Sequence, residues 1–138
     1  MEPYHHQLRV RYSETDQMGV VYHGNYIDWF EIGRTEYFRE QGVRYKDLEE
    51  EGILLIVSNI ESSYHYPARY DDLVTISTKV EQVKRTKLKF SYEIRNSETD
   101  KLLVTGKSTH AFVNQDFKPV VLQREAPEYW EQVFDKES

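Results

Sequence analysis

Hydrophobic and polar residues alternate along several stretches of this chain. Residues 6–12, HQLRVRY, place Leu8, Val10 and Tyr12 on one side and polar residues on the other. A period of two is typical of a strand with one buried face. Further strand patterns follow along the chain at 53–66, 73–80, 87–94 and 102–113. The sequence therefore predicts about five strands.

A different pattern fills residues 24–41, which Gly42 ends at a position suited to a helix C-terminus. At ~100° per residue, the polar side chains gather on one narrow strip and apolar side chains cover roughly two thirds of the circumference. That strip consists of Asp28, Glu31, Thr35 and Arg39. Such a helix is predicted to be wrapped by the rest of the fold. Gly33 costs about 1 kcal/mol of helix propensity and indicates a close approach by another backbone.

Two shorter helices are predicted, one over 45–52 and one that begins at Ala126-Pro127. The links KRT and NSETD are short, so the strands on either side of each should pair as antiparallel hairpins. The order is one strand, one buried helix and then four strands. This order favours a single α+β domain over 1–138, with an antiparallel sheet curled round a long central helix.

Composition narrows the possible functions. The formal net charge is −6, from 18 basic and 24 acidic residues, which argues against a nucleic-acid or anionic-membrane partner. The absence of cysteine excludes thiolate catalysis and cysteine-based zinc sites. The N-terminus has no apolar signal region, and no apolar run approaches about 18 residues, so we expect a cytoplasmic protein.

The sequence does not match the common motifs for phosphate binding, serine hydrolysis or metal binding. TGKST at 105–109 resembles the end of a phosphate-binding loop, but Lys101 stands where the first glycine belongs and the segment lies in a strand pattern. Gly106 is more simply a strand kink or a point of close packing. No G-x-S-x-G motif is present. The five histidines lack metal-ligand spacing, so no metal site is expected.

The segment YSETDQMGVVYHGNY, residues 12–26, brings Asp16 close to the start of the predicted central helix. Asp16 alone is typical of a turn, and Gly24-Asn25 of helix capping. However, the first N–H groups of a helix lack intrahelical partners and carry the positive end of its dipole. They can stabilise an oxygen that gains negative charge during acyl transfer, while a carboxylate nearby attacks the carbonyl or activates water. Gly24 would let a substrate approach the backbone.

Residues 11–38, RYSETDQMGVVYHGNYIDWFEIGRTEYF, resemble the signature of the 4-hydroxybenzoyl-CoA thioesterase-like proteins, which are hotdog-fold acyl-CoA thioesterases. A second stretch, YPARYDDLVTI at 66–76, also resembles this family where the chain enters its next strand. The resemblance implies a hotdog fold with Asp16 as the catalytic carboxylate. It places the oxyanion-binding backbone N–H at His23. We expect the Gly24 N–H to assist it, and Tyr22 and Asn25 to bind the substrate. The resemblance leaves open whether Asp16 acts as nucleophile or general base, and it implies no metal or cofactor beyond the CoA of the substrate.

Family members bind CoA phosphates with basic side chains near strand ends, often at a subunit interface. Lys84, Arg85 and Lys87 form the densest basic run in this chain and are the corresponding candidates, although a solvated turn is the alternative. Arg34 and Glu36 fall in the apolar arc of the central helix. We expect them to be structural and to pair with each other or with neighbours.

The sequence thus predicts an acyl-CoA thioesterase that assembles as a homotetramer of paired dimers, as the resemblance implies. One alternative is a thioesterase acting on acyl carrier protein. Another, from a different class, is a non-catalytic acyl-CoA sensor, which the Asp16 motif disfavours. The acyl group cannot be read from the sequence.

Overall fold

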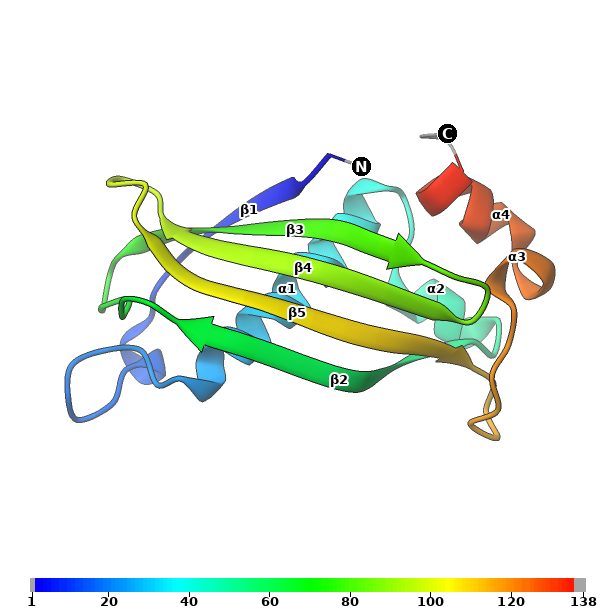
Figure 1. The fold of residues 1–138 in the computed structure, drawn as a ribbon, viewed down its shortest axis with the longest axis horizontal. Coiled ribbons are helices and arrows are strands. Elements are labelled where there is room, and N and C mark those ends of the chain that lie inside the picture. The colour runs from blue at the N-terminus through cyan, green and yellow to red at the C-terminus, as the bar shows by residue number, and fades with distance from the viewer. Residues whose placement is uncertain (1, 136–138) are drawn as a thin grey trace.

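The computed structural model describes residues 2–135 of the chain. The elements along the chain are β1 (Tyr4–Arg9), the 3₁₀ turn η1 (Tyr12–Glu14), α1 (Gly24–Glu40), α2 (Tyr45–Glu50), β2 (Leu54–Tyr64), β3 (Leu73–Val83), β4 (Lys87–Asn96), β5 (Leu102–Val113), α3 (Leu122–Glu125), α4 (Pro127–Trp130) and the π-helical turn η2 (Glu131–Asp135). Figure 1 shows the strands as one twisted sheet with α1 crossing behind it.

The five strands form one antiparallel sheet in the order β1-β3-β4-β5-β2. Both hairpins expected from short links, β3–β4 and β4–β5, are confirmed. β1 and β2 are the two edges. The segment 65–72 therefore crosses one end of the sheet to join β2 at one edge to β3, which lies next to the other edge. This crossing passes close to the start of α1 and will form one side of the site.

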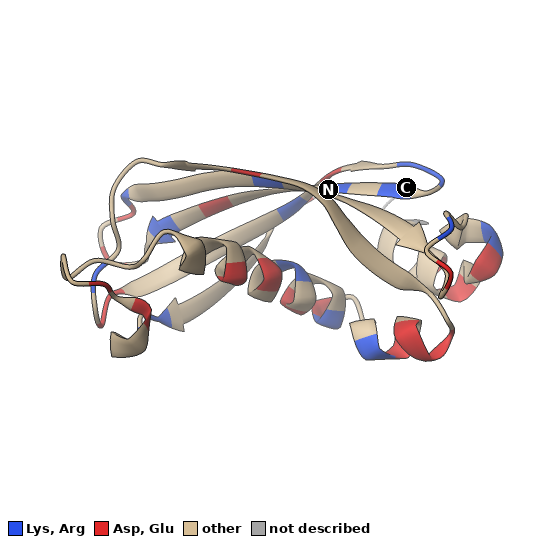
Figure 2. Cartoon of the chain, turned by 90° about the horizontal axis from the view of Figure 1, so that it is seen from below, with Lys and Arg blue, Asp and Glu red and all other residues tan. Residues whose placement is uncertain are grey.

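α1 packs its apolar face against the concave side of the sheet and turns charged residues outward (Figure 2). Trp29 and Phe30 are fully buried, and the Phe30 ring stacks on Tyr92 of β4 with the centroids 4.4 Å apart. The predicted α+β architecture, an antiparallel sheet around a 17-residue central helix, is confirmed. Burial of these aromatic side chains provides the main stabilisation of the helix on the sheet.

Two glycines mark the tightest contacts between α1 and the sheet. A Cβ on Gly33 would lie 2.4 Å from Thr78 Oγ1 and 2.9 Å from Ile76 Cγ2, so side chains of β3, and not another backbone, require this glycine. A Cβ on Gly106 would lie 2.4 Å from the Phe30 ring, which confirms the expected point of close packing.

Two local expectations were wrong. β1 ends at Arg9, because the chain turns into η1, and Tyr12 stands at the surface against Tyr70 instead of facing inward. The buried arc of α1 is narrower than predicted, since Ile32 is 37% exposed. The expectation that Arg34 and Glu36 pair with neighbours, when they do not pair with each other, is confirmed: Arg34 donates to the Tyr92 hydroxyl, and Glu36 pairs with Arg39.

Candidate active site

Asp16 is held in a small hairpin that leads into α1. Thr15 and Val21 form an isolated antiparallel bridge, and the N–H of Asp16 donates to the Val20 carbonyl at 2.9 Å. Gly19 closes the turn with a positive φ of 78°. The Asp16 carboxylate accepts from the Met18 N–H at Oδ1, at 2.9 Å. Its other oxygen has no bond to the described residues, so this half-buried carboxylate keeps one face for chemistry.

The hairpin is fastened to the segment 65–72. The N–H of Val21 donates to the Ala68 carbonyl at 2.9 Å, and Val20 forms a bridge with Arg69. On its other side, the N–H of Tyr22 donates to the Glu14 carbonyl at 2.9 Å. These bonds fix the hairpin between η1 and the chain that crosses the sheet end, so the position of Asp16 does not depend on its turn alone.

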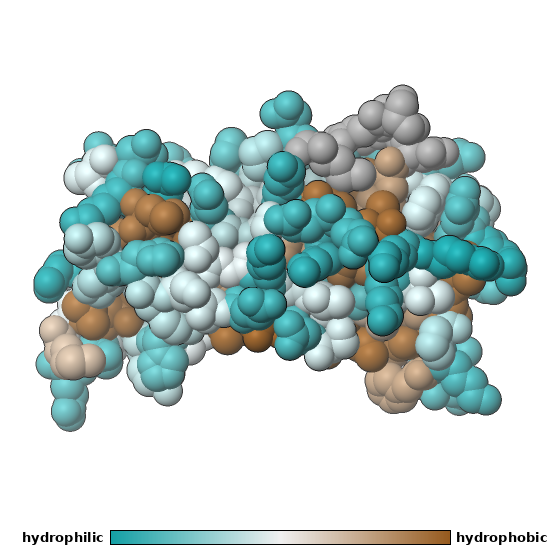
Figure 3. Space-filling view, viewed as in Figure 1, coloured by the Kyte–Doolittle hydropathy of each residue, from teal (hydrophilic) through white to brown (hydrophobic). Residues whose placement is uncertain are grey.

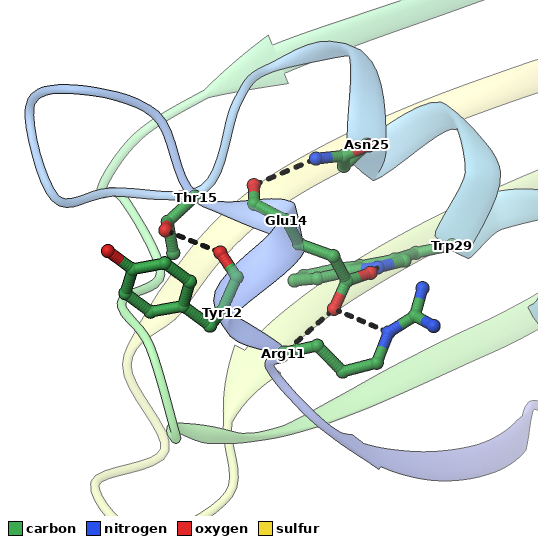
Figure 4. Close-up of polar contacts among 6 residues, drawn as sticks. All are labelled: Arg11, Tyr12, Glu14, Thr15, Asn25 and Trp29. Carbon is green, nitrogen blue, oxygen red and sulfur yellow. Dashed lines mark hydrogen bonds and ion pairs between the residues drawn. The ribbon is translucent and has the colours of Figure 1, made fainter.

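A second carboxylate, Glu14, lies two residues before Asp16 and has a different environment (Figure 4). Its Oε2 accepts from the Trp29 indole at 2.8 Å, and its Oε1 accepts from the Arg11 N–H at 2.8 Å, with the Arg11 guanidinium at 3.5 Å. Burial alone would raise the pKa of the Glu14 carboxyl, but these bonds outweigh burial and lower it. Glu14 is a structural anchor for α1 that the sequence reasoning missed.

The mouth of α1, meaning the backbone N–H groups of His23 and Gly24, lies at the end of this hairpin. Within residues 2–135, neither N–H donates to a backbone carbonyl, whereas the next one, Asn25, already donates to the Tyr22 carbonyl at 2.9 Å. Asn25 also fixes the mouth through its side chain, whose Nδ2 donates to the Glu14 carbonyl at 2.8 Å. Two free donors at the positive end of a 17-residue helix dipole can stabilise an oxyanion.

Aromatic rings surround the mouth. The Tyr22 and His23 rings lie 4.4 Å apart, and Tyr64 of β2 packs against both His23 and Tyr26. A Cβ on Gly24 would come within 2.9 Å of the Tyr22 ring, so the glycine makes room for this ring beside the mouth. Burial raises the pKa of the Tyr26 phenol, and this outweighs the bond from the Ala68 N–H, which lowers it.

Lys84, Arg85 and Lys87 lie at the opposite end of the sheet, in and beside the turn between β3 and β4 (Figure 1). All three are exposed. The Arg85 carbonyl accepts from the Leu122 N–H of α3, and the Thr86 carbonyl accepts from the Phe112 N–H of β5, which fastens the turn to both elements. A single chain therefore does not bring this basic run to Asp16. Asp16 lies on the hairpin that leads directly into Tyr22, His23, Gly24 and Asn25, and the roles assigned to all eight residues stay predictions.

A second group of polar residues, which no sequence pattern indicated, lies beneath α1. Arg34 donates to the Tyr92 hydroxyl at 3.4 Å, Tyr92 meets Ser108 Oγ at 2.5 Å, and Ser108 meets His110 Nε2 at 2.7 Å. We call these four residues the buried polar chain. Ser108 is 0% and His110 1% exposed. Burial and the Arg34 charge lower the pKa of His110 to about 4, so the imidazole is neutral.

The outer face of the sheet, turned away from α1, carries an open hollow of about 730 Å³. It is lined mainly by short hydroxyl side chains and by charges of both signs, and Figure 3 shows the area left of centre as pale and teal. None of the predicted site residues lines this hollow. In the part of the chain that is described, no three His, Asp or Glu side chains gather as a metal-binding group. Nor is any helix between residues 2 and 135 long and apolar enough to span a membrane.

Comparison with known proteins matches this geometry to a family. Residues 10–128 match the model of the thioesterase-like superfamily. The chain belongs to the thioesterase-like superfamily. This membership confirms the enzyme class expected from the sequence, a thioester hydrolase with a hotdog fold.

Individual relatives cover nearly the whole chain. The putative acyl-CoA thioesterase YneP of Bacillus subtilis is 36% identical over 131 residues, which are 94% of each protein. The DHNA-CoA thioesterase of Staphylococcus aureus is 36% identical, with a TM-score of 0.92 over 99% of this chain and 91% of that one. A mutant 4-hydroxybenzoyl CoA thioesterase complexed with 4-hydroxybenzoyl CoA is 19% identical, with a TM-score of 0.84 over 96% of this chain and 99% of that one, and it shares the fold.

Proposed function

We propose that this protein hydrolyses an acyl-CoA thioester to a free carboxylic acid and CoA. The observation that carries the proposal is the position of Asp16, a carboxylate with one unbonded oxygen on a hairpin that ends at the free amides of α1. Superfamily membership supports it, as do the relatives named as acyl-CoA thioesterases.

In this proposal the thioester carbonyl oxygen points at the N–H groups of His23 and Gly24. As a general base, Asp16 takes a proton from water while the water oxygen bonds to the carbonyl carbon. The C–S bond then breaks, and the proton passes to the CoA thiolate. As a nucleophile, Asp16 would instead displace the thiolate to form an anhydride, which water then hydrolyses. Both routes place negative charge on the oxygen that faces the helix, where losing one donor typically costs on the order of 10²–10³ in turnover.

Release of free thiol from a panel of short, medium, branched and aromatic acyl-CoA esters tests the proposal. We expect release from at least one ester and its loss in Asp16→Asn. Adding the same acyl group on acyl carrier protein distinguishes the two thiol carriers. Binding of acyl-CoA without release by the native protein would replace this proposal with the sensor.

We infer further that the site is completed by another copy of the chain, within the predicted homotetramer. β2 is an open edge of 11 residues whose outer N–H and C=O groups lack a strand partner within residues 2–135. Large apolar side chains are exposed around the hairpin, among them Met18 at 78% and Tyr12 at 76%. A symmetric pairing of two copies would also bring the basic run of one chain toward Asp16 of the other.

Subunit complementation tests this arrangement. One variant carries Asp16→Asn, and the other replaces Lys84, Arg85 and Lys87 by Glu. If the basic run serves the site of the partner, mixed assemblies regain up to about a quarter of the native sites. Mixtures no more active than the separate variants, or a monomer by light scattering, would contradict the shared site.

We expect this enzyme to act in the cytoplasm.

A further inference from the structure

The side chain of Tyr64, at the end of β2, reaches the backbone of the α1 mouth. Its hydroxyl donates to the His23 carbonyl at 3.5 Å and accepts from Ser62 Oγ at 2.6 Å. Because Ser62 supplies a donor to the Tyr64 oxygen, the phenol proton is free to point at His23. A chain of two hydroxyl groups thus links an edge strand of the sheet to the first peptide of the helix.

This peptide is the one that matters for the proposed chemistry. The carbonyl of His23 and the N–H of Gly24 belong to the same planar trans peptide and point in opposite directions. A bond that holds the carbonyl therefore also aims the N–H. A donor on the carbonyl oxygen also polarises the peptide, which makes its N–H a better donor. Apart from Tyr64, the His23 carbonyl accepts from the Tyr26 N–H at 3.3 Å, which is long for a backbone bond.

The Tyr64 ring is 47% exposed, and its other side packs against two aromatic rings. The Tyr64 ring packs at 5.6 Å from the Tyr26 ring and at 6.1 Å, edge to face, from the His23 imidazole. Tyr26 is itself buried and bonded to the N–H of Ala68 at 3.0 Å. The 3.5 Å bond to His23 is long, as bonds in an active site often are before the substrate arrives, and such bonds tighten in the reacting complex.

We propose that Tyr64 is a positioning residue that orients and polarises the His23–Gly24 peptide, so that the Gly24 N–H meets the thioester oxyanion. Tyr64 does not touch the reacting atoms in this role, and it makes its contribution in the transition state, where the oxyanion forms. Ser62 acts behind it by holding the phenol. The inference rests on the proposed thioesterase function.

Steady-state kinetics of Tyr64→Phe, which keeps the ring and removes the hydroxyl, test the inference. We expect kcat to fall about tenfold with KM within about twofold, as for other residues that orient an active group from behind. Ser62→Ala should lower kcat less, and the double variant should be no slower than Tyr64→Phe alone, because both changes break one chain. The matched control is Tyr66→Phe, whose hydroxyl makes no bond within residues 2–135 and which should keep native kinetics.

Each outcome separates this inference from the function on which it rests. An unchanged kcat in Tyr64→Phe alongside an inactive Asp16→Asn would overturn the positioning role and leave the thioesterase standing. A raised KM at native kcat would also overturn it, because Tyr64 would then bind the ground state. If the native protein releases no thiol from any acyl-CoA, both proposals fall. Melting temperatures of all variants should match within a few degrees, so that a kcat loss is not a folding defect.

Discussion

The mouth of α1 and the buried polar chain beneath the same helix contrast in their access to solvent. Ser108 and His110 lie 2.7 Å apart, a distance that suits a nucleophile and its base. Both are sealed under α1, and no acyl group can reach them. Asp16 has a weaker set of partners, but it is half-buried on the hairpin that leads to two free amides. Access of the substrate therefore decides which polar cluster can react. The buried polar chain, whose side chains pair closely with one another, stabilises the core instead.

The largest expected effect comes from Asp16→Asn. We predict a fall in kcat of about 10²–10⁴, because the carboxylate no longer attacks or takes a proton. The free energy of unfolding should change by less than about 1 kcal/mol, since the amide oxygen can still accept from the Met18 N–H. Thiol-release kinetics and urea unfolding measure the two quantities. Asp28→Asn removes an exposed charge on α1 as the control, and a fold lost together with activity would contradict the contrast.

We predict that acid destabilises the fold through His110 of the buried polar chain. The folded pKa of His110, about 4, lies below its ordinary value of 6.5, so between these pH values the unfolded chain binds the extra proton. The contribution of His110 to the free energy of unfolding should therefore be complete above pH 6.5. It should fall by about 3 kcal/mol as the pH drops toward 4. Urea unfolding at a series of pH values measures the slope. His110→Gln should flatten it, while His65→Gln, at an exposed position, should not; equal slopes in all three proteins would refute this assignment.

Glu14 lies two residues from Asp16, but we expect it to contribute to stability, as the buried polar chain does, and not to catalysis. Glu14→Gln places an amide N–H₂ against the Trp29 indole or the Arg11 N–H, so we predict a loss of about 2 kcal/mol of stability. The kcat of the folded enzyme should stay within a few-fold. Chemical unfolding and kinetics, with exposed Glu31→Gln as the control, make the test. A hundredfold loss of kcat in a stable Glu14→Gln would mean that the chemistry was assigned to the wrong carboxylate.

The smallest effect is expected from Ser108→Ala. Removing the hydroxyl leaves the Tyr92 hydroxyl and His110 Nε2 without this partner and should cost roughly 1 kcal/mol of stability. Activity should remain near native, because Ser108 is not a nucleophile. Ser91→Ala, on the outer side of β4, is the matched control. An inactive but stable Ser108→Ala would show that the buried chain takes part in the reaction.

The sequence patterns predicted most of the fold because periodicity reports which face of an element is buried. The strands after α1 and the central helix lie where they were expected, with ends differing by a few residues. Alternation failed in 10–12, where Val10, Arg11 and Tyr12 continue the strand pattern while the chain has already turned. The pairing of β2 with β5 joins segments far apart in the chain, and no local pattern encodes it.

For the site, the sequence singled out Asp16 and the mouth of α1 because turn residues and a helix start lie close together along the chain. Glu14 gave no such signal, since its role depends on Trp29, fifteen residues away. The buried chain was hidden for the same reason: Ser108 and His110 are neighbours on one face of β5, but their partners come from β4 and α1. Lys84, Arg85 and Lys87 lie at the opposite end of the sheet in one chain, and their predicted role at the site depends on the proposed second copy.

A crystal structure of Asp16→Asn with a bound acyl-CoA tests the central claim most directly. The account predicts the thioester at the mouth of α1, with its carbonyl oxygen about 2.7–3.1 Å from the N–H of His23 or Gly24 and the side chain of residue 16 facing the carbonyl carbon. A thioester bound in the outer hollow of the sheet, or at the mouth with its carbonyl turned away from both amides, would contradict it.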